Sequence, residues 1–332
     1  MKLITAMVTS IALLTGASSL YAAGLNTNDQ ENTPPCGDDW IYPTNGVHSD
    51  CLCTEQNNYC VAERNDNDPI DPSFPDYWMS EWTMYTITNE AASKANPPPY
   101  SSPPSTLTPS DYIVSYGASY YDSKWRPEKP TDKEDVGAML EYYDKFCLPI
   151  FGRTIEDNQH SCAFVSLGKQ AYYLTFPDGD NMQTNSSKQM LNQLKPDCCM
   201  FSPSNHPPRT DFIKHLDYWP QASQNLNSSV QAYYWKQMWE EVKPPILFAY
   251  AFYKPVPAQL ASTFSKLEQN PQSFFFTGSL EIEGEPLDPM VSQNYVNFQR
   301  RKPNTELWDS VKKWCPIDTT EKCRLFSDQR SE

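Results

Sequence analysis

Residues 112–201 constrain the possible fold of this chain most strongly. They form short runs rich in Tyr, Phe, Val and Ile, separated by turn residues, which is the usual pattern of antiparallel strands. Cys147, Cys162, Cys198 and Cys199 lie at the ends of these runs. We therefore predict a sheet stapled by disulfides, with the rest of the chain packed around it.

Individual strands can be assigned within this block. Residues 112–121 form one strand, in which Gly117 suggests a bulge. In residues 138–147, Ala138, Leu140, Tyr142 and Phe146 share one face, whereas Glu141 and Lys145 point the other way. Residues 162–167 and 171–176 are joined by Gly168 and Lys169 and indicate a hairpin.

Strand patterns continue on both sides of the block. Residues 78–89 place Trp78, Trp82 and Met84 on one face and Met79, Tyr85 and Ile87 on the other, so both faces of this strand are expected to be covered. Residues 246–253 and 273–283 also have strand character. Residues 209–218 indicate a short helix, and residues 228–242 fit either a helix or a strand, with the helix favoured.

The last predicted element is a helix that starts at Asn304 or Thr305. Its apolar stripe consists of Leu307, Trp308, Val311 and Trp314. With these elements we predict an α+β fold, in which a curved, half-barrel-like antiparallel sheet carries a few helices on one side. The expected divisions are a signal peptide at 1–23, a Cys-containing arm or knob at 24–76, the sheet domain at 77–300 and a closing tail at 301–332.

The first residues predict export. Lys2 precedes a mostly apolar stretch that ends in small residues, as in a signal peptide cleaved near Ala22 or Ala23. No later run approaches the roughly 18 apolar residues that would span a bilayer, so we predict a secreted or periplasmic location. The net charge of −15 makes binding to nucleic acids or anionic membranes unfavourable.

Ten cysteines in an exported chain predict up to five disulfides. All ten are candidates: Cys36, Cys51, Cys53, Cys60, Cys147, Cys162, Cys198, Cys199, Cys315 and Cys323. The adjacent Cys198 and Cys199 are strained if bonded to each other, so each should reach another strand, with Cys147 and Cys162 as the nearest partners. Cys315 and Cys323 are expected to close the tail locally.

Residues 24–76 allow two metal hypotheses beside the disulfides. His48 lies near Cys51 and Cys53, but the paired Cys-x₂-Cys spacings of a zinc site are missing. Asp66, Asp68 and Asp71 offer calcium ligands without the glycine and distal Glu of an EF-hand. We favour disulfides for the cysteines and a solvated acidic loop for the aspartates, and we predict no cofactor.

The sequence has no defensible catalytic motif. Gly-x-Gly-x-x-Gly, Walker and Gly-x-Ser-x-Gly patterns are absent, which disfavours nucleotide-dependent enzymes and α/β-hydrolases. His206 and His215 lie near Asp211 and Asp217 and would be the best acid–base or metal cluster, although their spacing matches no rule. Asn185 and Asn227 begin glycosylation sequons, which matter only in a eukaryotic source.

The order of features resembles that of ependymin-type secreted proteins and, through their fold, the LolA-like lipoprotein carriers. The residues that carry this resemblance are the aromatic strands, the Tyr-Tyr-Asp strand that runs into Cys147, and the Cys-led hairpin at Cys162. The similarity covers at most residues 78–253. It implies a curved sheet wrapped over a helix, with a cavity for a hydrophobic ligand or a lipid chain.

Three functions are compatible with these observations. The first is a non-enzymatic carrier of a hydrophobic small molecule or lipid, suggested by the aromatic strands and the missing catalytic motifs. The second is a secreted hydrolase of glycans, for which Trp, Tyr and abundant carboxylates are suitable. The third is a structural or surface-interaction protein, for which disulfides and stiff proline loops suffice.

Overall fold

The structure is a computed structural model of residues 1–332. It describes residues 62, 64–87, 91, 103, 105–130, 135–145, 160–176, 196–202, 207–223, 232–239, 246–254, 270–277, 280–282, 285–287, 290–317 and 320–323. All structural statements below concern these parts of the chain.

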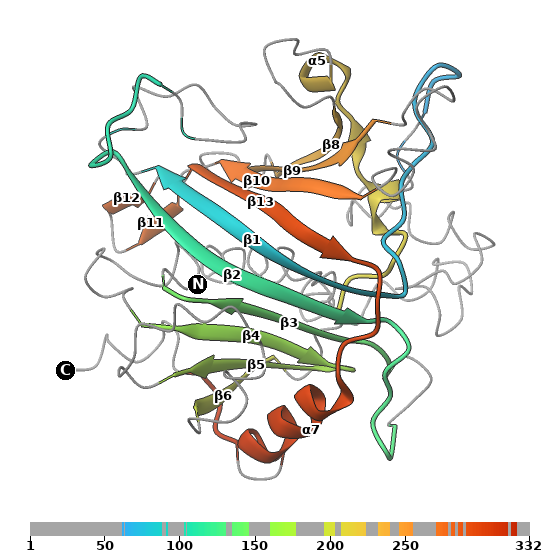
Figure 1. Ribbon diagram of the computed structural model, residues 1–332, viewed down its shortest axis with the longest axis vertical. Helices are drawn as coiled ribbons and strands as arrows, with labels where there is room; N and C mark the ends of the chain where they lie inside the picture. The colour runs from blue at the N-terminus through green and yellow to red at the C-terminus, as the bar shows by residue number, and fades with distance from the viewer. Residues whose placement is uncertain are drawn as a thin grey trace, which may run out of the picture.

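One open antiparallel sheet of 11 strands makes up most of the described fold (Figure 1). The order of its strands is β6-β5-β4-β3-β2-β1-β13-β10-β9-β8-β7. A separate two-stranded ribbon contains β11 and β12. The strands span Tyr77–Ile87 (β1), Tyr112–Asp122 (β2), Ala138–Tyr143 (β3), Cys162–Leu167 (β4), Gln170–Thr175 (β5), Asp197–Ser202 (β6), Asp217–Tyr218 (β7), Ala232–Trp239 (β8), Ile246–Tyr253 (β9), Pro271–Thr277 (β10), Leu280–Ile282 (β11), Glu285–Leu287 (β12) and Met290–Gln299 (β13).

The sheet is built from two meanders that meet in its middle. From β1 to β6, each strand pairs with the next one along the chain. The chain then crosses to the opposite edge, and β7 to β10 lead back toward the centre, where β13 pairs with both β10 and β1. The central strands β1 and β13 therefore come from distant parts of the sequence.

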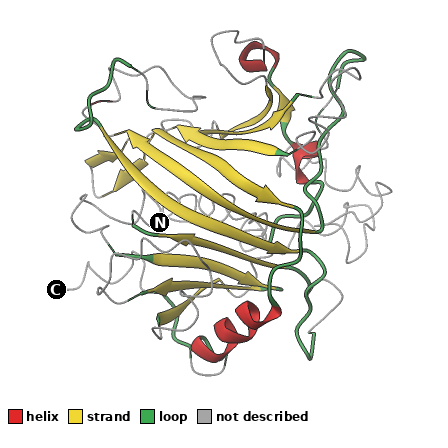
Figure 2. Cartoon of the chain, viewed as in Figure 1, coloured by secondary structure: helices red, strands yellow, loops and turns green. Residues whose placement is uncertain are grey.

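Helices contribute less than the predicted α+β class requires. The described helical elements are the 3₁₀ helix η3 (Phe212–His215) and the short α-helices α5 (Pro220–Ser223) and α7 (Thr305–Trp314) (Figure 2). The favoured helix in residues 228–242 is wrong, because Ala232–Trp239 is strand β8. Both faces of this strand are covered, since the adjacent residues Tyr234 and Trp235 are both buried. Pairing with β9 therefore outweighs the helical spacing of the aromatic residues.

The strand predictions for the centre of the chain are confirmed. In β1, Trp78, Trp82 and Met84 are all buried on one face, as expected. The hairpin of β4 and β5 turns at Gly168 and Lys169. Gly168 has a φ of 56°, a left-handed conformation that glycine adopts without steric cost. The predicted short helix near residue 212 and the final helix also occur, as η3 and α7.

The bulge predicted at Gly117 is wrong. Gly117 pairs regularly with Trp82 on β1 and with Tyr143 on β3. A Cβ atom at this position would clash with the Trp82 ring. The glycine therefore makes room for a buried indole rather than for an extra residue. The irregularity in this region lies between Met79 and Glu81, where β1 pairs with β13.

Helix α7 covers one face of strands β3 to β6, which we call the helix face. Asn304 caps the helix, because its side chain accepts a hydrogen bond from the Glu306 amide at 3.1 Å. The helix and the strands then bury one aliphatic cluster that includes Leu140, Val165, Leu174, Leu307, Trp308 and Val311.

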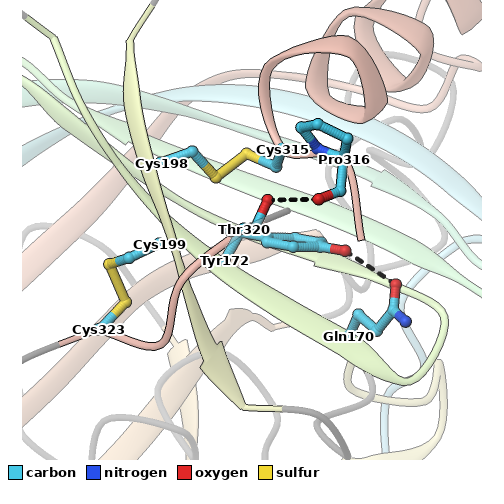
Figure 3. Close-up of a disulfide and its surroundings, with 8 residues drawn as sticks. All are labelled: Gln170, Tyr172, Cys198, Cys199, Cys315, Pro316, Thr320 and Cys323. Carbon is cyan, nitrogen blue, oxygen red and sulfur yellow. Dashed lines mark hydrogen bonds between the residues drawn. A yellow bond between two sulfur atoms is a disulfide. The ribbon is translucent and has the colours of Figure 1, made fainter. Parts of the chain in front are cut away.

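Two disulfides attach the C-terminal segment to edge strand β6 (Figure 3). They join Cys198 to Cys315 and Cys199 to Cys323, with Cα atoms 5.6 and 4.8 Å apart. The Cys323 amide also donates a hydrogen bond to the Met200 carbonyl at 2.9 Å. The tail therefore pairs with the edge strand that carries both cysteines.

This connectivity corrects the predicted pairing. Cys198 and Cys199 do bond to different elements, but their partners are not Cys147 and Cys162, and Cys315 does not close a local loop with Cys323. The reason is that α7 folds back over the sheet and brings Cys315 beside β6. Cys162 is also disulfide-bonded.

Several predictions concern residues that lie outside the described parts of the chain. They include the signal peptide with Ala22 and Ala23, the zinc hypothesis and the sequons. The residues concerned are Cys36, His48, Cys51, Cys53, Cys60, Cys147, Asn185, His206 and Asn227. These predictions stay as stated.

Candidate functional site

The face of the sheet opposite α7 is lined mainly by aromatic side chains, and we call it the aromatic face. Alternation along each strand places every second residue on this face. Rings therefore occur on this face on at least eight of the strands, and most of them are buried. They include Trp78, Trp82, Tyr121, Tyr143, Phe164, Trp235, Tyr250, Phe252, Phe274 and Tyr295.

Two segments from outside the sheet cover part of the aromatic face. Phe74 precedes β1, and Phe212 begins η3; their rings stack with centroids 5.6 Å apart. The Phe74 amide donates a hydrogen bond to the Thr210 carbonyl at 2.7 Å. From the sheet, the Tyr121 hydroxyl donates to the Pro208 carbonyl at 2.6 Å. The two segments and the sheet are thus held together by both ring contacts and hydrogen bonds.

A small pocket lies between this cover and the sheet, with a cavity volume of about 20 Å³. One water molecule needs at least about 10–15 Å³ of such space, so the pocket has room for a group of roughly that size. Phe74, Pro208, Arg209 and Phe212 line it from the cover. The sheet contributes Trp78, Tyr121, Met139, Glu141, Tyr250 and Tyr295.

The residues around the pocket require that the sheet bends. Glu141 is on β3 and Tyr250 is on β9, and four strands lie between β3 and β9 in the sheet. On a flat sheet the two strands would be about 24 Å apart, because neighbouring strands are spaced about 4.8 Å. Both residues nevertheless line one small cavity. The aromatic face is therefore concave, and the pocket lies inside the curve.

Glu141 is the only carboxylate among the residues that line the pocket. Its side chain is 4% exposed. The Ser119 hydroxyl donates to Glu141 Oε1 at 3.4 Å, and Ser119 in turn accepts a hydrogen bond from Trp82 Nε1 at 3.2 Å. Tyr143 provides a further side-chain hydrogen bond to Glu141. Among the described residues, no ion pair of this carboxylate with Lys, Arg or His is found.

Burial controls the ionisation of this group. Loss of hydration raises the pKa of Glu141 to about 8, although the hydrogen bonds from Ser119 and Tyr143 act in the opposite direction. Burial also raises the pKa of Tyr250 and Tyr295, and the nearby carboxyl group of Glu141 adds to both shifts. At neutral pH the ligand-free pocket therefore contains a protonated carboxyl group surrounded by neutral phenols.

The sequence pattern places Glu141 opposite the apolar face of its strand, a position typical of exposed charge. The placement was correct, but both faces of β3 are buried. Met139 and Tyr143 share the face of Glu141 and are apolar or aromatic. Met139 and Tyr143 were the sequence signal that Glu141 is buried, because a strand with large apolar residues at both alternating positions is covered on both sides.

The described residues of the proposed histidine cluster make other contacts, and His206 lies outside the described part of the chain. Asp211 forms ion pairs with Lys214 at 2.6 Å and with Arg209 at 3.9 Å. His215 ends η3, and Asp217 is exposed on β7. No group of three or more His, Cys, Asp or Glu side chains suited to a metal ion occurs within the described residues.

The acidic loop that was considered for calcium makes contacts within the protein. Asp71 pairs with Arg64 at 2.8 Å and accepts a hydrogen bond from the Trp235 indole at 2.9 Å. Asp68 accepts a hydrogen bond from the Asn65 amide at 2.8 Å. These contacts anchor the loop beside the aromatic face instead of leaving it fully solvated.

The helices that the structure describes are all too short or too polar to cross a bilayer. In comparisons with known proteins, neither a protein-family model nor a curated protein matches this sequence. The resemblance to ependymin-type and LolA-like proteins therefore stays a prediction, and functional inference depends on the pocket.

Proposed function

We propose that this chain is an exported, non-enzymatic binding protein that holds a small, mainly apolar molecule against its concave aromatic face. The pocket beside Glu141 carries this proposal. It is lined largely by rings, it contains few polar groups, and it lies inside a curved sheet. Concave apolar sites with a few placed polar groups are typical of small-molecule binding.

The size of the pocket limits the ligand. A cavity of about 20 Å³ accepts one end of a molecule, and a longer molecule has to extend past the cover. The partly exposed lining residues are Pro208, Arg209 and Phe212 on the cover and Tyr295 on the sheet, so the remainder of the ligand would leave past them. A bound lipid chain would require Phe74 and Phe212 to move apart.

Other observations are compatible with this function. The two disulfides suit an oxidising, extracellular or periplasmic compartment, in agreement with the predicted signal peptide. The open curved sheet has the general form expected of a half-barrel carrier, as the resemblance to ependymin-type and LolA-like proteins implies. Glycoside hydrolysis usually needs two carboxyl groups about 5–10 Å apart, whereas Glu141 has no second carboxylate in the pocket lining.

The experiment combines identification of a bound ligand with a binding measurement on a variant in which the pocket is filled. Protein purified under mild conditions from its native source should yield a small apolar compound by mass spectrometry. The recombinant protein should bind the apolar fluorophore N-phenyl-1-naphthylamine. Met139→Trp, which fills the pocket, should weaken this binding by about tenfold or more, equivalent to about 1.4 kcal/mol.

Met79→Trp is the matched control. Met79 lies on the helix face of β1 and is partly exposed, so the same substitution there should leave fluorophore binding unchanged. Circular dichroism would verify that both variants fold. If the wild-type protein binds no small molecule, or if both variants bind equally well, the carrier proposal is wrong, and a structural or interaction role gains support.

A further inference from the structure

Burial of the Glu141 carboxyl group costs free energy, and this group has no cationic partner among the described side chains. An isolated buried carboxylate loses much of its hydration energy, and a nearby positive charge normally compensates for this loss. Here the neighbouring polar groups are the Ser119 and Tyr143 hydroxyls, both neutral donors. Because Glu141 faces the cavity, a bound molecule could supply the missing charge.

We infer that the ligand carries a primary ammonium group, which enters the pocket and pairs with the Glu141 carboxylate. This inference rests on the proposed binding function and names the chemical class of its ligand. An –NH₃⁺ group is about as large as a water molecule and fits the available space, whereas a quaternary ammonium group is too large for it.

The surrounding rings favour the same group. A cation is attracted to the faces of Trp and Tyr rings within about 6 Å, most strongly in desolvated sites. Trp78, Tyr250 and Tyr295 all line the cavity with Glu141. The pocket therefore provides one carboxylate that pairs with the ammonium group and several ring faces that contact the apolar atoms next to it.

The other charged and titratable groups near the pocket come from several elements. Tyr143 on β3, Tyr250 on β9 and Tyr295 on β13 face Glu141 and stay neutral, since the pKa of each is raised by burial. Arg209 lines the cavity from the cover and pairs with Asp211 at 3.9 Å. Its charge acts on Tyr121, whose pKa it lowers against the larger effect of burial, and it does not contribute to the pKa of Glu141.

Ammonium binding is coupled to loss of a proton. Free Glu141 is protonated below about pH 8, and only its ionised form pairs with a cation. Aliphatic amines stay charged up to about pH 10. The affinity for an amine should therefore rise by about tenfold per pH unit between pH 6 and 8 and then level off, with release of about one proton per ligand at low pH.

The experiment uses ligands of equal chain length at pH 8.5. Isothermal titration calorimetry on the whole exported chain would compare n-hexylamine with n-hexanol, hexanoate and tetramethylammonium. We expect hexylamine to bind at least about tenfold more tightly than hexanol, and hexanoate and tetramethylammonium to bind more weakly still. Titrations at pH 6, 7 and 8 in buffers of different ionisation enthalpy would measure proton release by the wild-type protein.

Glu141→Gln should remove both the preference for the amine and its pH dependence. Glu81→Gln is the control, because Glu81 is exposed on the opposite face of β1. This variant should keep both the preference for the amine and the pH dependence of its binding. Equal binding of hexylamine and hexanol, or an amine affinity independent of pH in the wild-type protein, would overturn the ammonium assignment while leaving the binding function intact. Binding of none of the four compounds would instead count against the proposed function itself.

Discussion

Neighbouring residues of strand β3 point to opposite faces of the sheet, and their surroundings on the two faces differ sharply. Leu140 is fully buried on the helix face, where it packs in the aliphatic cluster that includes α7. Its neighbour Glu141 is almost as buried on the aromatic face, where it contacts hydroxyls and lines a pocket. The same strand therefore supports a closed apolar core on one side and a concave site on the other.

This contrast assigns different roles to the two faces. The helix face has the features of a stabilising core, with a capped helix, aliphatic packing and two cystines. The aromatic face retains a buried acid whose burial costs free energy. A group that lowers stability but faces a cavity is a candidate for binding rather than for folding.

The largest expected effect concerns the aromatic face at high pH. The folded protein keeps the Glu141 proton up to about pH 8, whereas the unfolded chain loses it near pH 4.5. Unfolding then releases a proton throughout this window, so the free energy of unfolding falls as pH rises through it. At pH 9, Glu141→Gln should raise the free energy of unfolding by roughly 5 kcal/mol at most, as measured by urea denaturation.

Measurements at low pH provide the reference for the comparison of Glu141→Gln with the wild-type protein. At pH 4, both the folded and unfolded wild-type chains are protonated at residue 141, so the two proteins should differ little in free energy of unfolding. A difference between Glu141→Gln and wild type that does not change from pH 4 to pH 9 would contradict the buried, protonated carboxyl group.

The second effect tests the helix face. Replacing Cys198 and Cys315 together by serine removes a cross-link between residues 117 positions apart. Loss of a native disulfide typically costs about 2–5 kcal/mol, and denaturation in urea would measure it. Because the aromatic face does not contain this bond, fluorophore binding below the transition should stay as in wild type. Loss of binding in the folded variant would mean that the two faces are not independent.

The smallest effect returns to the aromatic face. Gly117→Ala should lower the free energy of unfolding by about 1–3 kcal/mol through overpacking, because the new methyl group would clash with the Trp82 ring and with the Tyr142 carbonyl. Thermal denaturation would measure the loss. Adding Trp82→Phe should recover part of it, since the smaller ring relieves one of the two clashes. Independent, additive effects of the two substitutions would exclude direct contact.

The sequence was sufficient for the elements that depend on local pattern. Alternation in residues 78–89 identified β1 and its faces, and the Asn304 cap with the stripe from Leu307 located α7. The strand β8 was missed because aromatic residues at helical spacing also alternate well enough to line two sheet faces. Its choice of structure depends on pairing with β9, which local spacing does not encode.

The partners of the disulfides and the composition of the site depend on contacts between distant residues, which local sequence patterns do not encode. Cys315 reaches Cys198 only after α7 folds over the sheet. Glu141 comes near Tyr250 only because the sheet bends across four intervening strands. Neither the direction of a helix across a sheet nor the curvature of that sheet can be read from a single strand's pattern.

The meeting of two meanders at β1 and β13 has a consequence for how this protein acquires its structure. Ser80 on β1 donates a hydrogen bond to the carbonyl of Val296, 216 residues further along the chain. Such a remote pairing forms slowly, because a long loop must close first. Consecutive strands within each meander can pair as soon as they are synthesised, whereas the pairing of β1 with β13 has to wait for the last strand of the chain.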